Sequence, residues 1–177
     1  MKKNTVKNTR EAALRLYSVA RSNLLLMMVL TLANIVLFAV GTDTMLLFSA
    51  TVPYYSVVFG LIDPTGVLLV PGIVIAVLSL GAFFISWLLS KKNYGWMILA
   101  LALFIIDTIC MVGLYIWAED FSGILDFAIH IWVLYYLVVG VKTGAKLRRA
   151  ETEPVFEEEG VVLNGEEVQT AAETNEQ

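Results

Sequence analysis

Residues 94–117 read YGWMILALALFIIDTICMVGLYIW, and Asp107 is the single charged side chain among these 24 residues. A helix rises about 1.5 Å per residue, so roughly 20 apolar residues cross the hydrocarbon core of a bilayer. Inside lipid, every backbone N–H and C=O has to be paired within its own segment, which a helix achieves. The stretch therefore predicts a transmembrane helix.

Three further runs have the same character: residues 22–40, 67–89 and 121–141. The chain as a whole is 58% hydrophobic and 16% charged, whereas about a quarter of the residues of a soluble protein are charged. We therefore predict an all-α fold, namely an integral membrane four-helix bundle with spans at 22–40, 67–89, 94–117 and 121–141.

The charges are divided between the two sides of these runs. All 12 Lys and Arg residues precede the first run, separate the second run from the third, or follow the fourth. The other two connections carry only acidic charges, at Asp43, Asp63, Glu119 and Asp120. Because basic residues near span ends stay on the cytoplasmic side, this pattern predicts a multi-pass plasma membrane protein with its N-terminus and C-terminus in the cytoplasm.

Residues 1–21 form the first cytoplasmic segment in this prediction. Apolar residues at helical spacing, among them Leu16, Tyr17 and Ala20, alternate with Arg15 and Arg21, which is typical of a basic amphipathic helix. Such a helix either lies on the inner leaflet or extends the first span into the cytoplasm. The basic region and the apolar run that follows it are both longer than in a signal peptide, so we expect the run to be retained.

Residues 142–177 form the second cytoplasmic segment. A basic collar (Lys142, Lys146, Arg148 and Arg149) is followed by residues 151–177, which hold 9 acidic residues and no basic one. This polar tail is expected to be disordered, apart from a hairpin signal at Asn164 and Gly165. The basic inner face suits the anionic headgroups of the lipid bilayer, and no basic stripe indicates a nucleic-acid partner. The tail is hypothesised either to hold the collar away from lipid or to recruit a basic partner.

Residues 45–62 are uncharged, and by hydropathy alone they are long enough for a fifth span. A span there would place Lys91, Lys92 and the collar outside the cell, against the charge rule. Pro53 and Gly60 would also interrupt a helix. We therefore predict an outer re-entrant or interfacial segment.

Polar residues inside the spans are the candidates for function. Asp107 and His130 lie 10 and 9 residues from the outer ends of their spans, so antiparallel helices bring them to the same depth. An intramembrane carboxylate and imidazole reduce each other's burial cost when paired. Asp126 lies one helical turn from His130, and Asn34 and Ser79 are placed to complete a polar track.

The track has two interpretations that the sequence leaves open. It is either an interhelical clamp or a proton or ion path that opens outward. A metal held by His130, Asp107 and Asp126 would need three ligands from two helices, so no metal and no cofactor are expected. No catalytic motif of the Gly-x-Ser-x-Gly or His-Glu-x-x-His kind is present, so the protein is not expected to be an enzyme.

Four stretches together resemble a group of small, uncharacterised four-span membrane proteins from Gram-positive anaerobic gut bacteria: 20–25 (ARSNLL), 48–55 (FSATVPYY), 106–108 (IDT) and 130–137 (HIWVLYYL). The resemblance covers residues 12–149 and implies four spans in a bacterial plasma membrane, with no activity attached.

The sequence thus favours a non-enzymatic membrane component with an interaction or accessory role, acting through helix contacts as a homo-oligomer or with a protein partner. The alternative is a proton-coupled transporter or channel subunit that uses Asp107 and His130.

Overall fold

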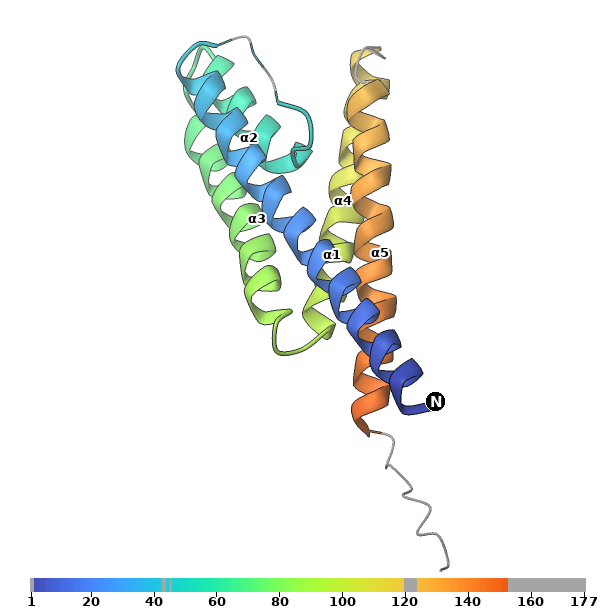
Figure 1. The fold of residues 1–177 in the computed structure, drawn as a ribbon. Helices are drawn as coiled ribbons and strands as arrows, with labels where there is room; N and C mark the ends of the chain where they lie inside the picture. The colour runs from blue at the N-terminus through green and yellow to red at the C-terminus, as the bar shows by residue number, and fades with distance from the viewer. Residues whose placement is uncertain (1, 43, 45, 120–123, 153–177) are drawn as a thin grey trace, which may run out of the picture.

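The computed structural model describes residues 2–42, 44, 46–119 and 124–152. It has five helices: α1 (Lys2–Ala39), α2 (Thr51–Ile62), α3 (Leu69–Leu89), α4 (Gly95–Ala118) and α5 (Ile124–Thr152), and no strand within the described ranges. All except α2 are long and apolar enough to cross a membrane (Figure 1). The prediction of an all-helical fold with four long apolar helices is confirmed, and these helices indicate a membrane-embedded protein.

Two helices continue well beyond their apolar runs. The basic segment 1–21 and the run 22–40 form the single helix α1 from Lys2, without a break at residue 21. In the same way, α5 runs through the basic collar to Thr152. The added turns contain Ala, Leu, Lys, Arg and Glu, which are strong helix formers, and no proline. The expected disorder of the tail and its hairpin signal lie outside the described residues.

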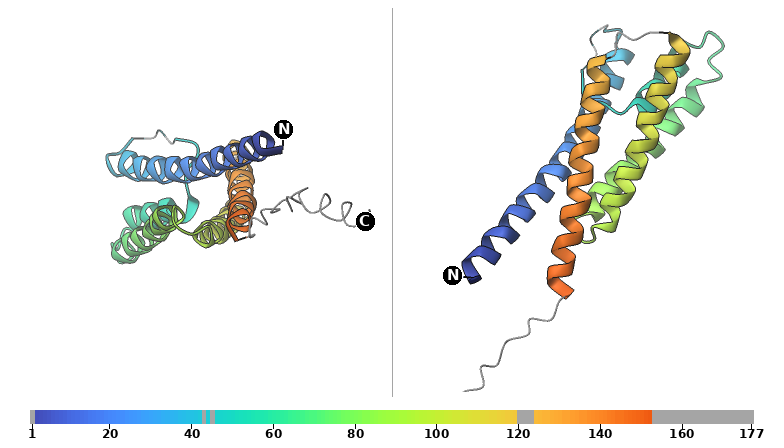
Figure 2. Two further views of the ribbon diagram at one scale, coloured as in Figure 1. Left: turned by 60° about the horizontal axis from the view of Figure 1, so that its bottom comes forward. Right: turned by 90° about the vertical axis from the view of Figure 1, so that its right-hand side faces the viewer.

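The long helices form a ring in which α1 packs on α5, α5 on α4, α4 on α3, and α3 back on α1. Figure 2 shows this order from one end of the bundle. Helix α1 crosses the bundle diagonally, so its N-terminal half lies against α5 and its C-terminal half against α2 and α3 (Figure 1). The short helix α2 packs mainly on α3 and also contacts α1 and α4. Contrary to the sequence argument, Pro53 and Gly60 do not interrupt it, because Pro53 lies in the first turn, where its missing N–H is not needed.

Glycines permit close approaches between helices. A Cβ on Gly140 of α5 would lie 2.7 Å from the Cβ of Ala20 on α1. A Cβ on Gly72 of α3 would collide with the backbone carbonyl of Ser56 on α2. Small residues at such positions let helix backbones come close in lipid, where association depends on van der Waals packing.

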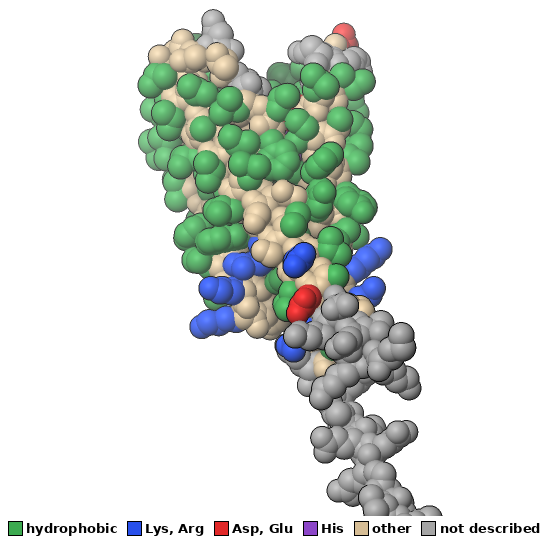
Figure 3. Space-filling view, viewed as in Figure 1, with side chains coloured by type: hydrophobic (Ala, Val, Ile, Leu, Met, Phe, Trp, Pro, Cys, Tyr) green, Lys and Arg blue, Asp and Glu red, His purple; other side chains and the backbone are tan. Residues whose placement is uncertain are grey.

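The core is apolar, and the outer surface is apolar as well. Leu24, Met27, Met97 and Leu137 are fully buried between the helices. Large side chains such as Ile109 and Trp132 instead face outward, with 65% and 58% of their surface exposed. An apolar belt of this kind suits lipid better than water. Figure 3 shows it in green, with Lys and Arg gathered at the end that holds the α1 N-terminus and the α3–α4 connection.

Candidate functional site

Asp107, near the middle of α4, lies at the N-terminus of α2. Its Oδ2 accepts a hydrogen bond of 2.9 Å from the backbone N–H of Thr51, and its Oδ1 accepts one of 2.7 Å from that of Val52. The first N–H groups of any helix have no partner within the helix. A carboxylate is also favoured at the positive end of the helix dipole. The residue preceding α2, Ala50, has no side-chain acceptor, so Asp107 supplies the cap from a different helix.

His130 of α5 joins this group from the other side. Its Nε2 lies 3.4 Å from Asp107 Oδ2 and 3.4 Å from the hydroxyl oxygen of Thr51. Its Nδ1 lies 3.0 Å from the backbone carbonyl oxygen of Asp126. Since a carbonyl only accepts, Nδ1 carries a hydrogen. Nε2 then either accepts from the Thr51 hydroxyl in a neutral ring or donates to Asp107 in a protonated ring.

Asp126 lies one turn before His130 and extends the group toward the α4–α5 connection. The hydroxyl of Tyr115 on α4 donates a hydrogen bond of 3.2 Å to Asp126 Oδ2. The other oxygen, Oδ1, lies 3.9 Å from His130 Nδ1. It is buried, and it has no hydrogen-bond partner among the described residues. The three ionisable side chains thus form a continuous row in the order Asp126, His130, Asp107.

Two side chains of α1 bind the chain that leads into α2. Asn34 Nδ2 donates a hydrogen bond of 2.7 Å to the carbonyl of Leu46, and the N–H of Leu46 donates one of 2.7 Å to Asn34 Oδ1. The hydroxyl of Thr31 accepts the N–H of Ala50 at 2.7 Å and donates to the carbonyl of Met27. Between these anchors Phe48 has a φ of 76°, a conformation that non-glycine residues rarely adopt. Such backbone persists where its surroundings fix it.

These contacts define a buried polar cluster made of Thr31, Asn34, Asp107 and His130. The four side chains are at most 2% exposed. They come from three different long helices, and each contacts the segment of residues 46–52. Thr31, Asn34 and Asp107 therefore supply the partners that backbone groups of the non-helical chain before α2 and of the first turn of α2 need inside an apolar bundle.

The aromatic ring of Phe104 closes the cluster on one side. It stacks on His130 with a centroid distance of 5.1 Å and an interplanar angle of 16°. Phe83 of α3 packs edge-on against Phe104 at 6.4 Å. Both phenylalanines are buried, so the imidazole lies between an aromatic face and polar partners.

The structure therefore brings together three of the five residues that the sequence selected: Asp107, His130 and Asp126. Asn34 does not join that row, because it binds Leu46. Ser79 is half-buried on α3, and the hydrogen bonds found in the described part of the chain do not connect it to the row. The sequence analysis did not predict a role for Thr31 and Thr51. Threonine hydroxyls are common in membrane helices, so the residue type alone does not indicate a functional position.

The acidic and histidine side chains of the row do not make a metal site. No group of three or more His, Cys, Asp or Glu side chains with a geometry suited to a metal ion occurs within the described ranges. The lone thiol of the chain, Cys110, is exposed on α4. The row can form hydrogen bonds to backbone groups, and its side chains can exchange a proton over short distances.

Searches against protein-family models, curated proteins and solved structures found no match to this chain.

Proposed function

We propose that this chain is a small multi-pass membrane protein with a non-enzymatic, interaction or accessory role, and that its intramembrane polar residues act as a clamp. The observation that carries the proposal is the engagement of both Asp107 oxygens by the N–H groups of Thr51 and Val52. The clamp holds residues 46–62 as a re-entrant segment, which enters the bundle as non-helical chain and returns as α2. Helix contacts with a second copy or with a protein partner are the expected mode of action.

The bonding of Asp107 supports a clamp over a proton carrier. Adding a proton to either oxygen would weaken an acceptor that a buried backbone N–H depends on. An unsatisfied N–H in an apolar environment costs about 1–3 kcal/mol. A carrier residue has to change its protonation state in every cycle, so each cycle would loosen the cap of α2.

The charge distribution supports a cytoplasmic location for both termini. The Lys and Arg side chains of α1, α5 and the α3–α4 connection gather at one end of the bundle (Figure 3). Basic residues at span ends favour the cytoplasmic side. With that end inside, the segment of residues 46–62 enters the bundle from outside.

A labelling experiment tests the orientation. In a Cys110→Ser background, Thr44→Cys should react with a membrane-impermeant maleimide on intact cells, because Thr44 is exposed near the start of the segment. Lys91→Cys should react only after the cells are permeabilised. The opposite pattern of labelling would overturn the orientation.

A second experiment tests the clamp. Asp107→Asn keeps one acceptor oxygen but turns an amide NH₂ toward the other backbone N–H. We expect it to lower the free energy of unfolding by about 1–3 kcal/mol. In the combined variant with Ala50→Cys, the introduced cysteine should become accessible to thiol reagents. Glu119→Gln, which removes an exposed carboxylate at the end of α4, is the matched control and should leave the cysteine at position 50 inaccessible to the reagent.

The runner-up is a proton-coupled transporter or channel subunit. The observation that favours it is the row of Asp126, His130 and Asp107, in which the buried Asp126 Oδ1 has no hydrogen-bond partner within the described residues. Proteoliposomes with an interior pH dye distinguish the two proposals. A proton flux that Asp107→Asn abolishes, with the thermal midpoint unchanged, would establish transport and contradict the clamp.

A further inference from the structure

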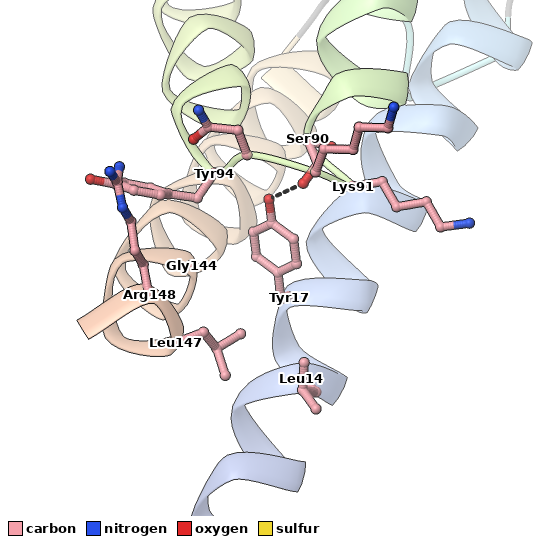
Figure 4. Close-up of a pocket in the computed structure, with 10 residues that line it drawn as sticks. Leu14, Tyr17, Ser90, Lys91, Tyr94, Gly144, Leu147 and Arg148 are labelled. Carbon is pink, nitrogen blue, oxygen red and sulfur yellow. Dashed lines mark hydrogen bonds between the residues drawn. The ribbon is translucent and has the colours of Figure 1, made fainter. Parts of the chain in front are cut away.

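A pocket of about 440 Å³ lies at the basic end of the molecule, where α1, α5 and the α3–α4 connection meet (Figure 4). Leu14 and Tyr17 of α1 lie opposite Leu147 and Arg148 of α5, and Tyr94 closes the side nearest the bundle. The pocket is separate from the buried polar cluster, which lies half-way along α4.

Cationic side chains line this pocket, and acidic ones do not. Lys91, Lys92 and Arg148 contribute three positive charges, and no Asp or Glu is found among the described residues that line it. The lysines are exposed, and their flexible four-carbon stems let the ammonium groups reach a ligand. Asn93 adds an amide. The positive charge of this lining favours an anion over a cation or a neutral ligand.

The walls of the pocket are held in place by contacts between helices. The hydroxyl of Tyr17 donates a hydrogen bond of 2.7 Å to the carbonyl of Ser90. The guanidinium of Arg148 lies over the ring of Tyr94, 5.6 Å from its centroid. Gly144 lets both tyrosines approach α5, since a Cβ there would lie 2.7 Å from Tyr94 Cβ and 2.9 Å from the Tyr17 ring. The pocket is therefore formed before any ligand binds.

The position of the pocket favours a lipid as the source of the anion. It lies just beyond the apolar stretches of α3 and α4, which is the level of the headgroups on that side. Leu14, 48% exposed, and Leu147 give it an apolar edge beside the charges. Basic pockets between membrane helices bind anionic headgroups.

We propose that this pocket binds the phosphate group of an anionic phospholipid headgroup, with Lys91, Lys92 and Arg148 as the recognising cations. The site rests on the membrane location of the protein and not on the clamp, so it stands or falls separately from the function proposed above.

Native mass spectrometry of the full-length protein, released from micelles containing phosphatidylglycerol or phosphatidylcholine, tests the site. The wild type should retain one phosphatidylglycerol in preference to phosphatidylcholine. The double variant Lys91→Gln/Lys92→Gln should bind phosphatidylglycerol at least roughly 30-fold more weakly, since each direct hydrogen bond from a lysine to the phosphate contributes about 1 kcal/mol or more and tenfold corresponds to about 1.4 kcal/mol.

The matched control is Lys142→Gln/Lys146→Gln, which removes two charges from the same end without changing a residue that lines the pocket. It should weaken binding by less than about threefold. Equal losses in the two double variants would show diffuse attraction and overturn the site. Inorganic phosphate or glycerol 3-phosphate that competes at the same concentration as the lipid would assign the pocket to a soluble phosphate compound and overturn the lipid source.

Discussion

Asp107 accepts a hydrogen bond of 2.7 Å from the backbone N–H of Val52, although 55 positions separate the two residues. The distance from the same carboxylate to His130 Nε2 is longer, at 3.4 Å. The closest partners of the charged residue in α4 are thus two amides at the start of α2. The N-terminus of α2 needs hydrogen-bond acceptors, and this need explains why the carboxylate of Asp107 is buried.

Asn34→Leu tests whether α1 holds the same segment. The substitution keeps the size of the side chain but removes both hydrogen bonds to Leu46. Because it leaves one N–H and one C=O without partners, we expect the free energy of unfolding to fall by about 2–4 kcal/mol. Thermal unfolding in detergent, followed by size-exclusion chromatography, measures this.

Asn23→Leu is the control for that change, since Asn23 lies on the same helix and makes no hydrogen bond among the described residues that involves its side chain. It should change stability by less than about 0.5 kcal/mol. If the two leucine variants were equally stable, Asn34 would have no anchoring role.

The four long helices could be predicted from the sequence because the apolar runs are long and nearly uncharged. Counting residues from the span ends also brought Asp107 and His130 to one depth, and the structure has them 3.4 Å apart. Helix ends were harder to predict. A hydropathy analysis places the end of a helix where charged residues begin, whereas residues 2–21 and 142–152 continue the helices because most of their residue types favour a helix.

The partners of the polar residues could not be predicted in the same way. Asp107 and Asn34 bind backbone groups, and backbone groups are present at every position, so no residue type marks the ones that need a partner. The depth of Asn34 within its predicted span was the only reason to group it with Asp107 and His130. Its bonds to Leu46 depend on the path of residues 40–50, which only the three-dimensional structure provides.

Gly72→Ala tests the contact between α3 and α2. The added Cβ would collide with the carbonyl oxygen of Ser56, so one helix has to move. We expect a loss of about 1–3 kcal/mol in the free energy of unfolding, as for overpacked sites. Gly81→Ala on the same helix meets nothing within 4 Å and should be neutral or slightly stabilising, because alanine is the better helix former. A stable Gly72→Ala protein would contradict this packing.

Arg21→Lys tests the attachment of α1 to the end of α3. The guanidinium donates 3.0 Å and 3.1 Å hydrogen bonds to the Ser90 hydroxyl and the Trp87 carbonyl, and it lies 5.4 Å from the centroid of the Trp87 ring. Lysine keeps the charge but loses the planar fork, so we expect a loss of about 1–2 kcal/mol and a shift in Trp fluorescence. Arg15→Lys, at an exposed position, should leave both unchanged.

We expect Asp63 to make the stability of the α2–α3 connection depend on pH. Hydrogen bonds from the N–H of Leu68 and from the hydroxyl and N–H of Thr65 hold the pKa of this carboxyl below its usual value. A lowered pKa means that the carboxylate stabilises the folded turn at pH values above the ordinary Asp value. That contribution is lost as the pH falls through the lowered pKa, because the protonated group accepts these bonds less well.

Hydrogen exchange at the Leu68 and Thr65 amides measures this dependence. Protection should be constant from pH 7 down to about pH 5 and then fall in more acidic solution, after correction for the intrinsic exchange rate. Asp63→Asn should show weaker protection with no such fall. A wild-type profile that stays flat below the ordinary Asp pKa would mean that the carboxylate does not hold the turn.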